Sequence, residues 1–153
     1  MPGLTEKEKT EYMAIAGSYL ANYHVQMMKA FIQHGSVTTY DHCCSVATLA
    51  FCLNRRLKLG LDEKTLVAGA LLHDFCLYDW HLPHREMGLH GFTHPATACG
   101  NAVKYFGVGP KVQDVIRSHM WPVTLFVLPH SGEAWLVSFT DKYVAFIETF
   151  FKR

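Results

Sequence analysis

The stretch that decides the fold is Leu71-Leu72-His73-Asp74-Phe75, in which an imidazole and a carboxylate end an apolar run that starts at Leu66. An apolar run of this kind is normally buried, and a buried histidine–aspartate pair needs partners for its charge and lone pairs. A divalent metal ion would satisfy both side chains at once. The question for the rest of the chain is therefore whether it supplies further ligands.

Three helices are predicted on the N-terminal side of this pair. The first begins after Thr5, with Glu8 as its capping-box partner, and continues to about His34. The second begins at Thr38, and the third is capped by Asp62 and leads directly into the His-Asp pair. The pair therefore lies at the C-terminal end of a short apolar helix.

On the C-terminal side, a segment without clear periodicity runs from Cys76 to Thr93, a length that is usually functional in a compact domain. His94 then occupies a cap position, with Pro95 as the first residue of a helix. Further helices are predicted from Lys111 to about His119 and from about Gly132 to Phe151. Two-residue alternation is nearly absent, so we predict an all-α fold in one domain, residues 1–153.

Composition excludes several classes of protein. The formal net charge of +1 gives no electrostatic reason to expect a nucleic-acid polymer or an anionic membrane as partner. No stretch approaches the ~20 apolar residues of a membrane helix, and the charged N-terminus lacks the apolar core of a signal peptide. The five cysteines are odd in number and form no CxxC pair, which argues for a reducing compartment. We therefore expect a cytoplasmic protein.

Metal-capable side chains recur along the chain in an ordered series: His42, His73, Asp74, His94, His119 and Asp141. Taken singly, His42 is an ordinary helix-start residue and His94 an ordinary cap. Asp141 stands among apolar neighbours and needs a partner if it faces inward. Imidazoles and carboxylates without thiolates suit Fe, Mn, Zn or Ni, with Mg also possible.

This series resembles the HD-domain superfamily, in its metal-dependent phosphohydrolase type with six ligands. The segments that carry the resemblance are Asp41–Val46, Leu71–Asp74, Thr93–Pro95, Ile116–His119 and Thr140–Lys142. The resemblance implies a helical bundle with a central metal pocket, a metal-binding core at about 38–150, and the helix 5–34 packed on it. It also implies that His42, His73, Asp74 and Asp141 bind one ion, and that His94 and His119 add a second, with Asp74 as the bridge.

For activity, the resemblance implies hydrolysis of a small phosphate ester such as a nucleotide, with His73 and Asp74 as catalytic residues. A hydroxide activated by the metal would attack phosphorus. Four residues could hold the phosphate, although a solvated or structural role is about equally compatible with their positions: His81, His84, Arg85 and Lys142. Asp74 is followed by Phe75-Cys76, whereas many relatives have Ile-Gly.

Two alternatives remain open from the sequence. Some members of the superfamily use a mixed-valence di-iron site, with the same four histidines and two aspartates, to cleave carbon–carbon or carbon–phosphorus bonds. Others are non-catalytic ligand-binding modules. A binding-only module has no need of all six ligands, so the full set favours an enzyme.

Overall fold

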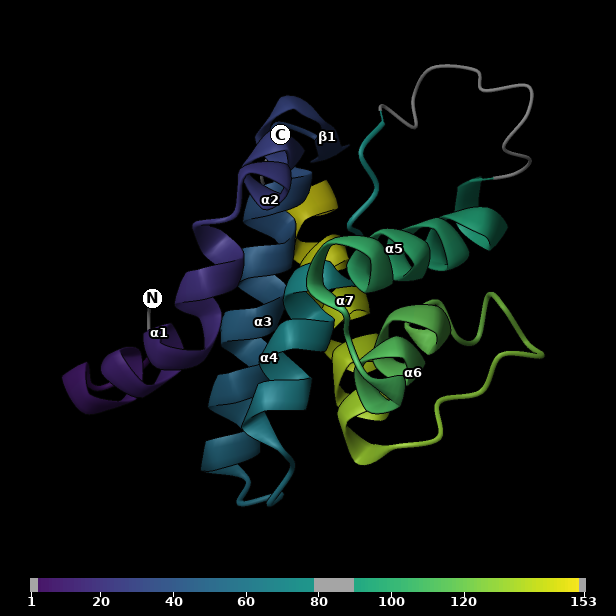
Figure 1. Cartoon of the computed structure of the whole chain (residues 1–153). Helices are drawn as coiled ribbons and strands as arrows, with labels where there is room; N and C mark the ends of the chain where they lie inside the picture. Colours follow the sequence, from purple (N-terminus) through teal and green to yellow (C-terminus); the bar gives the residue numbers. More distant parts are fainter. Residues whose placement is uncertain (1–2, 79–89, 152–153) are drawn as a thin grey trace.

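The computed structural model describes residues 3–78 and 90–151, and in these ranges the protein is an assembly of α-helices (Figure 1). The helices are α1 (Glu6–Leu20), α2 (Tyr23–Met27), α3 (Thr39–Arg56), α4 (Glu63–Leu72), α5 (His90–Phe106), α6 (Pro110–Ser118) and α7 (Gly132–Phe151). A 3-10 turn η1 (Met28–Ala30) leads into a small antiparallel hairpin of β1 (Ile32–His34) and β2 (Val37–Thr38). The predicted all-α class is confirmed. None of the described helices is long and apolar enough to cross a membrane.

Helix α4 is the centre of the bundle. Every residue from Thr65 to Leu72 is buried, and α4 packs against α1, α3, α6 and α7. Helix α6 approaches α4 closely at Gly69, where a Cβ atom would lie only 2.5 Å from Cγ1 of Val115. An apolar helix buried on all sides thus delivers the His-Asp pair to the interior rather than to the surface.

The predicted starts of three helices are confirmed by their caps. Thr5 and Glu8 form the expected capping box of α1, with the Glu8 carboxylate accepting from the Thr5 N–H at 2.8 Å. The Thr38 hydroxyl caps α3, and the Asp62 carboxylate caps α4. These caps satisfy backbone N–H groups that the first turn leaves without an intrahelical partner.

The prediction of one helix from residue 5 to about His34 is wrong in its second half. Helix α1 ends at Leu20, and the Asn22 side chain caps the separate helix α2 by accepting from the His24 N–H. The chain then turns into the β1–β2 hairpin, whose connection is possible because Gly35 has a φ of +57°. This break redirects Gln33 and His34 toward the interior of the bundle.

The predicted start of the helix that follows His94, which corresponds to α5, is also wrong. Helix α5 begins at His90, so His94 is not its cap and Pro95 lies inside the helix. A proline so close to the start removes only one intrahelical hydrogen bond, a loss that packing can offset. His94 consequently projects from the second turn of a helix and not from a cap position.

Candidate metal centre

Six side chains from separate parts of the chain converge at the centre of the bundle. They are His42 on α3, His73 and Asp74 directly after α4, His94 on α5, His119 directly after α6, and Asp141 on α7. All six are buried. Three overlapping groups of them have potential ligand atoms within 4.8 Å of one another: His42, His73 and Asp74; His73, His119 and Asp141; Asp74, His94 and His119.

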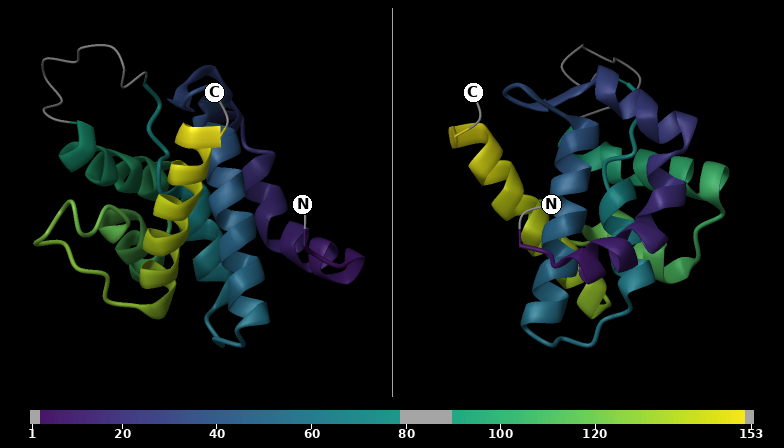
Figure 2. Two further views of the ribbon diagram at one scale, coloured as in Figure 1. Left: turned by 180° about the vertical axis from the view of Figure 1, so that it is seen from behind. Right: turned by 90° about the vertical axis from the view of Figure 1, so that its left-hand side faces the viewer.

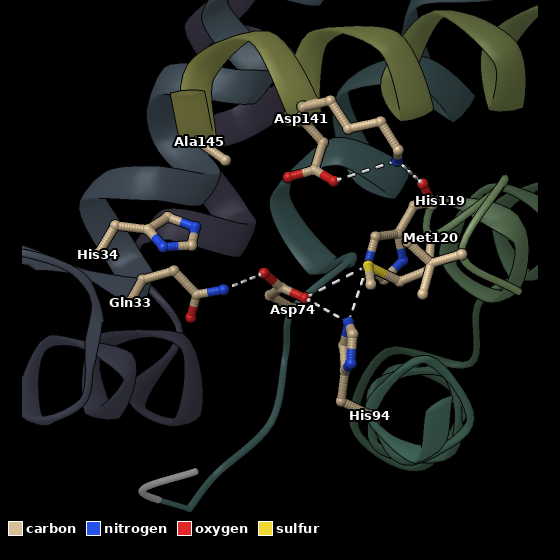
Figure 3. Close-up of a pocket in the computed structure, with 10 residues that line it drawn as sticks. Gln33, His34, Asp74, His94, His119, Met120, Asp141 and Ala145 are labelled. Atoms are coloured by element: carbon tan, nitrogen blue, oxygen red, sulfur yellow. Dashed lines mark hydrogen bonds and ion pairs between the residues drawn. The ribbon is translucent and has the colours of Figure 1, made fainter. Parts of the chain in front are cut away.

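The two carboxylate oxygens of Asp74 face different sides of the cluster (Figure 3). Its Oδ2 lies 3.3 Å from Nε2 of His73 and 3.9 Å from Nε2 of His42. Its Oδ1 lies 3.2 Å from Nε2 of His94 and 3.4 Å from Nε2 of His119. One carboxylate therefore lies between two pairs of imidazoles, with one oxygen directed to each pair.

Asp141 completes the first of these sides. Its Oδ1 lies 3.1 Å from Nε2 of His42 and 3.6 Å from Nε2 of His73. On the second side, Nε2 of His94 and Nε2 of His119 are only 2.9 Å apart. Two ring nitrogens so close together need a proton or a cation between or beside them, since their lone pairs otherwise repel.

Contacts behind three of the imidazoles leave Nε2 as the atom that faces the cluster. Nδ1 of His73 lies 2.8 Å from the carbonyl oxygen of Ala70, and Nδ1 of His119 lies 2.7 Å from that of Ile116. Nδ1 of His42 lies 2.7 Å from a carboxylate oxygen of Glu148. A carbonyl or ionised carboxylate oxygen only accepts, so Nδ1 carries a proton in each of these rings, and a cation at Nε2 would take the place of any proton on that nitrogen.

The donor set fits a divalent cation. Nε2 of His73 and Oδ1 of Asp74 are buried, and within residues 3–78 and 90–151 they have the ion-pair contacts given above but no hydrogen bond of good geometry. Leaving such atoms unsatisfied costs about 1–3 kcal/mol each. Both atoms point into the cluster, where an ion held by imidazole nitrogens and carboxylate oxygens would satisfy them together.

A cavity of about 260 Å³ opens onto this cluster. It is lined by Gln33, His34, Asp74, His94, His119, Met120, Val123, Asp141, Lys142 and Ala145. The Gln33 amide donates to Oδ2 of Asp74 at 2.6 Å, and Figure 3 shows it on the opposite side of Asp74 from His94. Four of the six clustered residues thus contact a space large enough for a small ligand.

Comparison with known families gives a match over most of the chain. A family model described as the HD domain matches residues 39–145. The chain belongs to the HD-domain family. The match begins at the first residue of α3 and ends on α7, so it spans the segments that contribute all six clustered side chains. The superfamily consists mostly of metal-dependent hydrolases, and some members are not catalytic. Neither the curated proteins nor the solved structures gave a match.

In this HD domain, the nitrogen atoms that could bind a cation are also the atoms that bind protons when no cation is present. Burial opposes the protonation of His42, yet Asp141 and Glu148 raise the pKa of its imidazole to about 10. His73 is also buried, and the charge of Asp74 raises its pKa well above the usual 6.5. Against their own burial, the surrounding imidazoles hold the pKa values of Asp74 and Asp141 well below the usual range. Protons on His42 and His73 therefore neutralise the carboxylates wherever a cation does not, whereas burial lowers the pKa of His119.

Of the four residues predicted to bind the substrate, one lines the cavity and the other three lie outside the described residues. Lys142 lines the cavity, with Nζ 2.6 Å from the carbonyl oxygen of His119 and 3.8 Å from Oδ2 of Asp141. Burial lowers the pKa of its amine. His81, His84 and Arg85 lie outside the described residues.

Two histidines to which the sequence assigned no role lie away from the cluster of six side chains. His24 stacks on Tyr105, and His130 contacts Asp114. Arg117, two residues before His119, donates to Cys99 and does not line the cavity.

Three residues at the centre were missed from the sequence. Glu148 contacts Nδ1 of His42 across 106 residues of chain. Gln33 and His34 reach the cavity from β1, within a segment predicted to be helical. The one available signal was for Glu148: it stands seven residues after Asp141, two helical turns along the same face of α7.

Proposed function

We propose that this HD domain is a metal-dependent phosphohydrolase that acts on a small phosphate ester, such as a nucleotide. The observation that carries the proposal is the placement of the Asp74 carboxylate, whose two oxygens face two separate groups of buried imidazoles. A bridging carboxylate between two ions has this form. We also propose that residues 1–153 form a single domain.

In this proposal, six side chains hold two ions of Fe, Mn, Zn or Ni. His42, His73 and Asp141 would hold one ion, His94 and His119 would hold the other, and Asp74 would contribute to both. When bound, such ions lower the pKa of a water molecule and neutralise the charge of a phosphate during attack on phosphorus. Glu148 and the backbone carbonyls of Ala70 and Ile116 orient three of the imidazoles that would hold the ions.

The substrate would enter the cavity beside Asp74. A volume of about 260 Å³ is below the ~300–1,000 Å³ typical of sites for drug-sized ligands, so the described part of the cavity suits a phosphate group and a few neighbouring atoms. Lys142 would bind a phosphate oxygen, since its amine already lies at the wall next to Asp141. His81, His84 and Arg85 remain further candidates for this role.

The decisive experiment combines metal analysis with substitution of Asp74. Protein purified without oxygen should contain stoichiometric metal and release phosphate from a panel of phosphate esters. Asp74→Ala should lower phosphate release by at least about 100-fold, which corresponds to about 3 kcal/mol in the barrier. Asp114→Asn, on α6 but outside the centre, should leave the rate within a few-fold. Protein without metal, or unchanged hydrolysis by Asp74→Ala, would overturn the proposal.

A second candidate function is di-iron oxygenase chemistry, favoured by the convergence of four histidines with two aspartates. Oxygenases of the superfamily use this ligand count. Bound iron with a di-iron EPR signal and O₂ consumption would support it. Retained phosphate release after exchange of the metal for Mn or Ni would favour the hydrolase instead.

A further inference from the structure

The outer face of α7 is almost entirely aromatic. Its exposed positions from Trp135 onward are Trp135, Phe139, Tyr143, Phe146, Thr149, Phe150 and Phe151, and Thr149 is the exception in this set. The first five aromatic residues of the face are between 44% and 63% exposed. Figure 2 (left) shows α7 crossing the front of the molecule, with the other helices behind it.

We name these five residues, Trp135, Phe139, Tyr143, Phe146 and Phe150, the aromatic stripe. At 100° per residue they fall within an arc of about 80° on the helix. Their spacing therefore produces one continuous strip along nearly the full length of α7. A strip of this size on the outside of a protein marks an interaction surface.

The four charged residues of α7 do not occupy this face. Glu133, Asp141 and Glu148 are buried, and the Lys142 amine bends toward the His119 carbonyl and the Ser138 side chain. An ordinary surface helix carries its charged residues outward. Helix α7 instead uses its charged residues in the interior and presents aromatic rings to the outside.

We infer that the aromatic stripe is the interface of a homodimer, in which α7 packs antiparallel against α7 of a second copy. The stripe reads almost the same in both directions, with spacings of four, four, three and four residues. In an antiparallel pair related by a twofold axis near Tyr143, Phe139 meets Phe146 of the other copy and Trp135 meets Phe150. A twofold interface requires a surface that is complementary to itself, and an uncharged one meets its own copy without electrostatic repulsion.

The area of the stripe is sufficient for a stable pair. Aromatic side chains bury about 150–250 Å² each, so five rings that are about half exposed offer roughly 550 Å² per chain. Two copies would bury roughly 1,100 Å², above the ~1,000 Å² expected of a biological interface and more apolar than most. The aromatic stripe lies on the opposite side of α7 from Asp141, so this inference stands independently of the proposed activity.

The test is the oligomeric state of the full chain by analytical ultracentrifugation. The wild-type protein should sediment as a dimer at micromolar concentration. F139E should raise the dimer dissociation constant at least 100-fold, and the milder F146Q at least about 5-fold. F126E is the matched control, because Phe126 is 99% exposed but lies outside α7, and this variant should remain dimeric.

A double variant tests the antiparallel register. Combining F139E with F146K in one chain places opposite charges face to face twice in the dimer, so dimerisation should be restored relative to F139E alone. Thermal unfolding checks that each variant is folded. A monomeric wild type would overturn the inference, as would a dimer that persists in folded F139E. Monomeric protein that co-floats with vesicles of phosphatidylcholine and phosphatidylserine would identify a membrane surface as the partner instead.

Discussion

Glu148 connects the C-terminal half of α7 to the metal centre through a single imidazole. Its carboxylate lies 2.7 Å from Nδ1 of His42, whose Nε2 faces Asp141 at 3.1 Å. A carboxylate behind a histidine fixes the ring orientation and increases the basicity of the nitrogen on the far side. We therefore propose that Glu148 acts through His42, as a positioning residue of the candidate metal centre.

Glu148→Gln should lower the affinity for metal about 10-fold, within the range seen when such supporting groups are lost. The amide can still accept a hydrogen bond from His42 but lacks the charge that increases its basicity. The dissociation constant would be measured by competition with a chromophoric chelator. Glu133→Gln is the control, because Glu133 is also buried on α7 but accepts from the Asp62 N–H, away from the centre. Equal metal affinities in the two variants would refute the role of Glu148.

Metal binding should become stronger as the pH rises. The pKa of His42 is raised to about 10, so its protonation stabilises the metal-free fold below pH 6.5, and this contribution is lost as the pH rises through about 10. A cation at Nε2 must displace that proton, and His73 behaves in the same direction. The carboxylates of Asp74 and Asp141 stay ionised throughout this window because their pKa values are lowered.

Between pH 6.5 and 9, the logarithm of the metal association constant should therefore rise by about one to two per pH unit. Calorimetric titrations in two buffers of different ionisation enthalpy would count the protons released. A pH-independent affinity would mean that the imidazoles are already neutral in the metal-free protein.

The six clustered residues were all named from the sequence, because each belongs to a short motif whose order along the chain is informative. The residues that support them could not be named in this way. Gln33 binds Asp74 across 41 residues and Glu148 binds His42 across 106. Contacts of this kind depend on how helices pack, and a single sequence holds no local signal for them.

At the scale of elements, the close approach of α4 and α6 depends on a missing side chain. Gly69→Ala should destabilise the protein by about 1–3 kcal/mol, because the new methyl group would lie 2.5 Å from Cγ1 of Val115. Chemical denaturation would measure the change in the free energy of unfolding. Gly17→Ala is the matched control, since nothing lies within 4 Å of that position on α1, and it should be neutral or stabilising by up to about 1 kcal/mol. Equal effects of both substitutions would show that the α4–α6 contact adjusts freely.

Elements with strong end signals were predicted well, and elements set by tertiary contacts were not. Three helices have a capping side chain that the sequence identifies: Thr5 for α1, Thr38 for α3 and Asp62 for α4. The region after Leu20 contains only one strong helix breaker before Ser36, Gly35, so its sequence permits a continuous helix. The chain turns there because Asn22 caps a new helix and the hairpin packs against α3. The hydrophobic periodicity of a single segment does not indicate such tertiary contacts.

At the scale of the whole molecule, the candidate metal centre joins helices that are far apart in the sequence. Its side chains come from α3, α5 and α7 and from the ends of α4 and α6, so bound ions would link five helices. Metal removal by a chelator should lower the melting temperature by about 5–10 °C, the shift expected when the free ion is present at 100 times its dissociation constant. Asp74→Ala should show little further change on chelation. A melting temperature that does not respond in the wild-type protein would exclude tight metal binding by the folded state.

The complete burial of α4 has a consequence for the rate at which ligands exchange. Amide hydrogens in a helix without an exposed residue from Thr65 to Leu72 become accessible only when most of the protein opens. His73 and Asp74, anchored directly to that helix, therefore stay in place during smaller fluctuations. If the proposed ions and substrate bind, they would have to come and go on the cavity side, where the Gln33 amide contacts Asp74 from the β1–β2 hairpin. Hydrogen exchange followed by mass spectrometry should accordingly find the slowest amides in α4 and much faster ones in β1.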